Sequence, residues 1–139
     1  MSKNKKKRTI KKTSTEEVEK IKAKTISFSF KYLDTNHSKF PFDSKNPIYW
    51  QALIRRLSDL SKLTRLELIQ NSSKALRFHK IDWKDTSEKS FGLPEKQRVE
   101  IPYQFSVSSN EYGRVHGFFI HEVFYIVWLD PNHQLYPRK

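Results

Sequence analysis

The sequence contains no cysteine and only three glycines among its 139 residues. Without cysteine, the chain can form neither a disulfide scaffold nor a zinc site with thiolate ligands. Few glycines leave little material for loops that wrap nucleotide phosphates, and the chain has no P-loop, G-x-S-x-G, Rossmann or H-E-x-x-H motif. The motif-defined classes of nucleotide-binding protein, serine hydrolase and zinc protease are therefore not indicated.

Long hydrophobic runs are also absent. No apolar stretch reaches the length of a membrane span, and the first residues lack the apolar core of a signal peptide. We therefore expect a cytoplasmic protein that does not bind a membrane. The length leaves room for one domain with a hydrophobic core, and no internal repeat is present.

Positive charge dominates the composition, with 27 lysines and arginines against 15 acids and a net charge of +12. We expect residues 1–13 to form a disordered basic arm and residues 14–139 to fold as a single domain. Nucleic acid is the favoured polyanionic partner, because no basic amphipathic helix with a strong apolar face suggests a membrane. A solubilising tail is the alternative role of the arm. Its candidate nucleic-acid contacts are Lys5, Lys6, Lys7, Arg8, Lys11 and Lys12.

Three helix starts can be recognised from their capping residues. Ser14 and Glu17 have the spacing of a capping box and predict a short helix to about residue 24. Asn46 followed by Pro47 is a favourable N-cap with proline at the first helical position. A second capping box at 64–67 begins another short helix. In the Asn46 helix we expect one apolar face to enter the core, namely Trp50, Leu53, Ile54, Leu57 and Leu60.

Strands are predicted where apolar residues alternate with polar ones, over residues 25–33 and 101–108. Residues 76–83 form a short, ambiguous candidate in which Arg77 and His79 would share a face. Residues 113–130 read as a β-hairpin with both faces apolar. Because strands joined by short turns run antiparallel, we expect an α+β fold in which an antiparallel sheet of about four strands carries a helical hairpin on one face.

The hairpin sets the position of the polar residues. A turn at His121–Glu122 predicts the cross-strand pairs Ile120/Val123, Phe118/Tyr125, His116/Val127 and Arg114/Leu129. In this register the open end of the hairpin brings Arg114 and His116 close to the loop 130–133. We expect any active site to lie there.

This order of elements in a small basic chain resembles the RelE/HigB-type ribonuclease toxins. The resemblance covers residues 25–136. It implies an N-terminal strand, a helical hairpin and a sheet whose later strands and C-terminal tail cleave messenger RNA. It also implies a substrate presented on the ribosome and an antitoxin partner. The block around GRVHG and VWLDPNHQLYP is similar, in addition, to small uncharacterised proteins of bacteria and their mobile elements.

Metal-independent RNA cleavage needs a base, an acid and a cation beside the phosphate, roles that suit histidine and arginine. Arg114 is the candidate phosphate ligand, with His116 and His133 as acid and base. Tyr136 is a further acid or a stacking platform, and His79 with Arg77 completes the set if that segment lies alongside. No cofactor is expected.

Three other interpretations remain open. His116 could be a buried, hydrogen-bonded histidine, with Asp130 capping a turn and Tyr136 closing the core. His116, Asp130 and His133 could instead bind a metal, although their spacing matches no known ligand pattern. The whole protein could be a non-catalytic module of a mobile element, which binds nucleic acid or inhibits another protein.

Overall fold

The computed structural model describes residues 24–137 except residues 44, 95, 98 and 100. The predicted basic arm, with Lys5, Lys6, Lys7, Arg8, Lys11 and Lys12, and the predicted helix that begins at Ser14 lie outside the described residues. Within the described part of the chain, no helix has the length and apolar character needed to cross a membrane.

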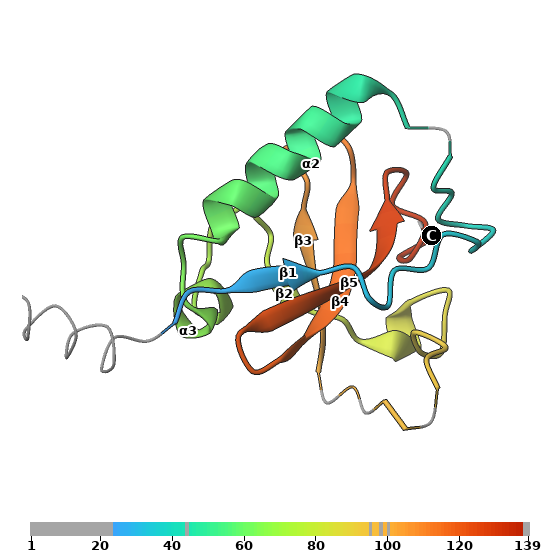
Figure 1. The fold of residues 1–139 in the computed structure, drawn as a ribbon. Helices are drawn as coiled ribbons and strands as arrows, with labels where there is room; N and C mark the ends of the chain where they lie inside the picture. Colours follow the sequence, from blue (N-terminus) through green and yellow to red (C-terminus); the bar gives the residue numbers. More distant parts are fainter. Residues whose placement is uncertain (1–23, 44, 95, 98, 100, 138–139) are drawn as a thin grey trace, which may run out of the picture.

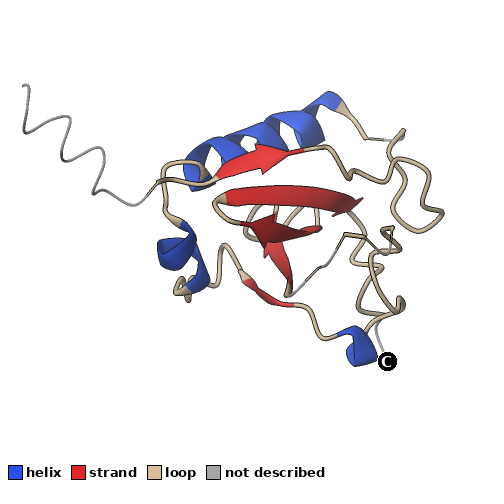
Figure 2. Cartoon of the chain, turned by 60° about the horizontal axis from the view of Figure 1, so that its bottom comes forward, coloured by secondary structure: helices blue, strands red, loops and turns tan. Residues whose placement is uncertain are grey.

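The described residues form an α+β fold with one mixed sheet. The strands are β1 (Ser27–Ser29), β2 (His79–Lys80), β3 (Pro102–Ser106), β4 (Arg114–Ile120) and β5 (Val123–Asp130). They follow the order β1-β5-β4-β3-β2, which can be traced in Figure 2. The expected antiparallel sheet of about four strands is therefore wrong, because β1 is parallel to β5 while the other neighbours are antiparallel. In the chain, two helices and three strands separate β1 from β5, so no tight turn forces these two neighbours to run antiparallel.

The two outer strands are shorter than the alternation predicts. β1 ends at Ser29, and Phe30, one of the alternating apolar residues of the predicted strand 25–33, is 50% exposed. β2 contains only two residues, and Arg77, two positions before its start, has a φ of 53°, which is outside the range of a strand. Arg77 and His79 nevertheless both remain exposed while Phe78 between them is buried, as the ambiguous strand predicted.

Both predicted helices of the hairpin are present, as α2 (Pro47–Leu60) and α3 (Arg65–Ile69). The side chain of Asn46 caps α2 by accepting from the backbone N–H of Tyr49 at 3.0 Å, and the capping box at the start of α3 forms as predicted. The expected core face of α2 is partly wrong, because Ile54 is 59% exposed. The buried face instead consists of Tyr49, Leu53, Leu57 and Leu60.

Apolar layers cover both faces of the sheet. On one face α2 and α3 pack against residues such as Phe105, Phe124 and Ile126. On the other face there is no long helix among the described residues, and loops cover the sheet, including the segment with the 3₁₀ turn η1 (Trp83–Asp85) and Phe91. Figure 1 shows α2 on one side of the sheet and the yellow segment after β2 on the other. The central strands are therefore buried on each face, as their apolar sequence predicts.

A β-bulge divides the β4–β5 hairpin into two registers. Near the turn, Ile120 pairs with Val123 and Phe118 with Tyr125, as predicted. Beyond the irregularity between His116 and Gly117, the expected partners Val127 and Leu129 are wrong. His116 lies opposite Trp128 and Arg114 opposite Asp130. Val127 is the extra residue of the bulge, so that Trp128 packs on the loop-covered face and Leu129 on the helix-covered face.

Gly117 lies at this irregularity because no side chain fits there. A Cβ atom on Gly117 would lie 2.1 Å from the carbonyl oxygen of Tyr125 and 2.6 Å from a ring carbon of Phe124. Gly92, in contrast, has a φ of +69°, but a Cβ atom added to it would meet nothing within 4 Å among the described residues. Substitutions at these two glycines therefore distinguish the cost of steric crowding, at Gly117, from the cost of backbone strain, at Gly92.

We expect Gly117→Ala to lower the free energy of unfolding by about 3 kcal/mol or more, because both neighbours belong to the buried hairpin. Gly92→Ala should cost about 1 kcal/mol, from left-handed backbone strain alone. Urea unfolding followed by tryptophan fluorescence measures both. Equal losses in the two variants would contradict the close approach at the bulge.

Candidate functional site

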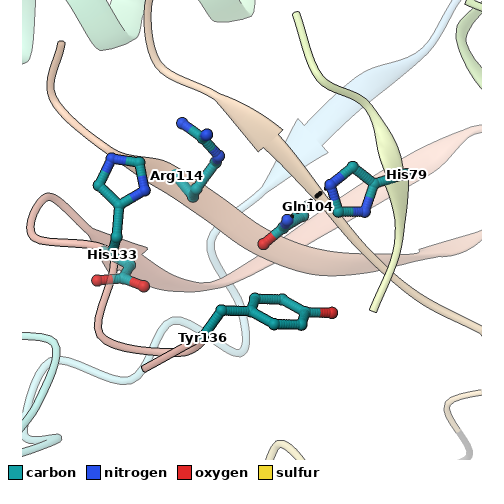
Figure 3. Close-up of a pocket in the computed structure, with 6 residues that line it drawn as sticks. His79, Gln104, Arg114, His133 and Tyr136 are labelled. Carbon is teal, nitrogen blue, oxygen red and sulfur yellow. Dashed lines mark hydrogen bonds between the residues drawn. The ribbon is translucent and has the colours of Figure 1, made fainter. Parts of the chain in front are cut away.

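A cavity of about 340 Å³ opens at the predicted end of the hairpin. It lies between the starts of β2 and β4, the middle of β3 and the segment that follows β5 (Figure 3). The six lining residues are His79, Gln104, Arg114, Asp130, His133 and Tyr136. The structure thus brings together four residues that the sequence singled out, His79, Arg114, His133 and Tyr136, from segments far apart in the chain.

Asp130 fixes the loop that carries His133 and Tyr136. One carboxylate oxygen accepts from the backbone N–H of Gln134 at 2.7 Å, and the other accepts from the N–H of Leu135 at 2.9 Å. Burial alone would raise the pKa of Asp130, but these bonds and one from His116 outweigh it and lower the pKa below its usual value. Asp130 is therefore an ionised turn cap, as one interpretation of the sequence proposed.

His116 lies behind Asp130 rather than in the cavity. Its side chain is fully buried, and its Nε2 donates to Asp130 Oδ2 at 3.1 Å. Burial lowers the pKa of His116, with the hydrogen bond to Asp130 opposing this effect, and Nδ1 has no hydrogen-bond partner among the described residues. His116, expected as an acid or base, therefore does not line the cavity. Its ring is a neutral donor that positions Asp130.

His79 is held by two hydrogen bonds at the mouth of the cavity. Its Nδ1 donates to the carbonyl oxygen of Lys80 at 3.0 Å, and its Nε2 accepts from the Nε2 of Gln104 at 2.8 Å. These partners fit the neutral ring with its proton on Nδ1. The exposed imidazole is thereby fixed in orientation by a strand residue beneath it.

Gln104 lines the cavity but was not among the residues predicted from the sequence. It is 5% exposed, and its Oε1 is buried with no hydrogen-bond partner among the described residues. Figure 3 shows this oxygen on the side away from His79, above Tyr136. The signal in the sequence is a carboxamide between the inward-facing Tyr103 and Phe105, on a strand whose other face is also buried. An unpaired acceptor of this kind is costly unless a water molecule or a ligand in the cavity donates to it.

Arg114 provides the positive charge of the cavity. Burial lowers the pKa of Arg114, the charge of Arg77 lowers it further, and Asp130 raises it. A guanidinium remains charged at any physiological pH. Arg77 does not line this cavity. It lines a neighbouring one, together with His79 and Arg114.

Tyr136 closes the lower side of the cavity in Figure 3. Its hydroxyl accepts from the backbone N–H of Asp82 at 3.0 Å. Burial raises the pKa of Tyr136, and the charges of Asp82 and Asp85 add to this effect. The phenol is therefore protonated at neutral pH and keeps its proton available for donation.

Two remaining predictions concern a metal site and the turn of the hairpin. His116, Asp130 and His133 do not form a metal site, since no group of three or more histidines or acids in the described part of the chain could hold an ion. His121 has a φ of 52° at the exposed hairpin turn, as predicted.

Comparison of the chain with protein-family models, with curated proteins and with solved structures finds no match.

The low pKa of His116 predicts acid sensitivity. The unfolded chain takes up a proton at this residue as the pH falls below its ordinary value of 6.5, whereas the folded chain resists it. The free energy of unfolding should therefore decrease between pH 7.5 and pH 5, by on the order of 1 kcal/mol per pH unit from this residue. Asp130, whose pKa is lowered from 3.8, stays ionised in this window.

His116→Gln keeps a donor toward Asp130 but cannot titrate, so its pH slope should be flatter than that of the wild type. Urea unfolding across the same pH range measures the slope. His121→Asn is the control and should follow the wild-type slope, because the residue is exposed. Parallel curves for His116→Gln and the wild type would show that His116 is not a buried neutral ring.

Proposed function

We propose that the cavity binds RNA and cleaves it without a metal ion, as a small basic ribonuclease of the toxin type. One observation carries the proposal. Figure 3 shows His133 on one side of Arg114 and His79 on the other. In-line cleavage of a phosphodiester requires a base and an acid on opposite sides of the phosphorus, with a cation beside its oxygens.

Arg114 is the proposed ligand of the scissile phosphate. Its guanidinium can donate two parallel hydrogen bonds to phosphate oxygens. The backbone position of Arg114 is set by its pairing with Asp130 across the hairpin. Asp130 is already hydrogen-bonded to the loop and to His116. Its negative charge stabilises the guanidinium of Arg114, and none of these bonds joins it to another cation.

The proposed reaction uses the ribose as its own nucleophile. The 2′-oxygen attacks phosphorus while one imidazole accepts the 2′-hydroxyl proton. The bond from phosphorus to the 5′-oxygen then breaks, and the other imidazole gives that oxygen a proton. The products are a 2′,3′-cyclic phosphate and a free 5′-hydroxyl. His79 and His133 are the proposed pair, and Gln104 must release the Nε2 atom of His79 when substrate binds.

Two further groups favour a ribonucleotide among phosphate-containing ligands. The unpaired Oε1 of Gln104 needs a donor, which a ribose hydroxyl or a base amino group supplies. The half-buried ring of Tyr136 offers a stacking surface for an unpaired base, beside its hydroxyl.

The net charge of +12 supports the choice of a polyanionic substrate. We include in the proposal a cytoplasmic location, additional RNA contacts from the basic residues 1–13, presentation of the substrate on a ribosome and control by an antitoxin. The last two follow from the resemblance to RelE/HigB-type toxins alone. The test of cleavage does not depend on them.

We expect His133→Asn and His79→Gln each to lower the rate of RNA cleavage by roughly 10²- to 10⁴-fold, the usual contribution of an acid or base. His121→Asn is the matched control. His121 and His133 have φ angles of 52° and 55°, and asparagine tolerates this conformation, so backbone strain is equal in the two variants. The assay follows a fluorescent oligoribonucleotide at fixed salt and identifies the cyclic phosphate by mass spectrometry.

Two results would contradict the proposal. Equal cleavage by all three variants would show that any activity arises elsewhere. Salt-sensitive RNA binding without turnover in the wild type would instead identify a non-catalytic nucleic-acid-binding module.

A further inference from the structure

A second cavity lies beside the first. It has a volume of about 290 Å³ and shares His79 and Arg114 with the first cavity. Its remaining lining includes Lys74 and Arg77, on the segment between α3 and β2. The proposed reaction makes no use of either side chain.

The charges around the second cavity all have one sign. Lys74, Arg77 and Arg114 line it, and none of the described acids does. Asp130, which lines the first cavity, does not extend to the second. Like charges that share a cavity repel one another, and an anion between them removes the repulsion.

Two further observations indicate that the arrangement is built rather than incidental. Arg77 has a φ of 53°, a conformation that costs free energy in any residue with a side chain, and its N–H is bonded to the carbonyl oxygen of Ser73 at 2.9 Å. In addition, Arg77 and Arg114 line the same cavity, and the positive charge of Arg77 lowers the pKa of Arg114. The backbone is therefore held in a strained form that places a second arginine next to the first.

We propose that the second cavity binds the phosphate group adjacent to the scissile one in the same RNA strand. The inference rests on the proposed function, since it names the substrate as an oligonucleotide with at least two phosphates. An internal phosphate is the favoured source, because the two cavities share a wall and a continuous backbone can pass from one to the other. A terminal phosphate or free inorganic phosphate has the same chemistry and is distinguished below.

The test measures binding with probes that cannot be cleaved. The first probe is a 2′-O-methyl trinucleotide with two phosphodiesters. Two further probes have the same sequence but carry a neutral methylphosphonate at the first or at the second linkage. Each of them therefore has one negative charge instead of two. We expect the doubly charged probe to bind about tenfold or more tightly than either singly charged probe, the effect of one charge-assisted contact. Isothermal titration calorimetry at fixed salt measures the three dissociation constants.

Lys74→Ala should reduce this difference between the probes to about threefold or less, since the variant removes one of the three cations of the cavity. Lys62→Ala is the matched control, because its side chain is 73% exposed and lines neither cavity. It should retain the full difference. Circular dichroism checks that both variants are folded.

Two results would overturn the inference. Equal binding of the singly and doubly charged probes would show that the second cavity takes no phosphate. The same comparison with a dinucleotide that carries a terminal phosphate, and with inorganic phosphate as a competitor, identifies the source of the phosphate. If Lys74 raises the affinity for either of these as much as it raises the affinity for the trinucleotide, an internal phosphate is not the ligand.

The outcome is separable from that of the proposed function. Because the probes lack the 2′-hydroxyl nucleophile, their binding does not depend on cleavage. Loss of the charge effect in a protein that cleaves RNA overturns only the second cavity. A retained charge effect in a protein that does not cleave RNA overturns only the ribonuclease reaction.

Discussion

The carboxylate of Asp130 joins three parts of the molecule that the chain order keeps apart. Through His116 it is tied to β4, through Gln134 and Leu135 it closes the loop after β5, and it lies opposite Arg114 in the sheet. Leu135 then enters the core as a fully buried residue. Together with the bonds from Ser87 to Gln134 and Leu135 and from Asp82 to Tyr136, these bonds fix the segment with His133 and Tyr136 over the cavity.

The β-bulge at Val127 makes this arrangement possible. In an uninterrupted hairpin Arg114 would pair with Leu129, and Asp130 would lie one position beyond it. The extra residue shifts Asp130 opposite Arg114 and puts His116 within hydrogen-bond distance of it. The bulge fits at Gly117 because glycine has no Cβ atom, and the neighbouring groups leave no room for one. A local irregularity thus determines which polar groups meet.

The sequence contained the elements but not their exact pairing. Capping residues such as Asn46 and Thr64 act locally, so the starts of α2 and α3 could be predicted. The register beyond His116 could not, because both faces of β4 and β5 are apolar and a one-residue shift leaves the pattern unchanged. The parallel pairing of β1 with β5 is equally invisible to local patterns, since it depends on the path of a long connection.

The same limit applies to the candidate site, where residue types could be read from the sequence but burial and packing could not. Residue types and the open end of the hairpin were enough to indicate Arg114, His133 and Tyr136. The sequence could not exclude His116, because a histidine beside a carboxylate has the same sequence pattern in a core as in a cleft. Only its burial in the structure separates His116 from the residues of the cavity. Gln104 was missed because its importance lies in the unpaired oxygen, which only the packing around β3 reveals.

The central claim is that two imidazoles of this cavity flank a bound phosphodiester. NMR spectra of the five histidine rings, recorded while an uncleavable 2′-O-methyl oligoribonucleotide is added, test it directly. We expect the resonances of His79 and His133 to shift together and saturate at one affinity, while those of His37 and His121 stay in place. Shifts confined to His37 or His121, or none at His79 and His133 although the RNA is bound, would show that the ligand binds elsewhere.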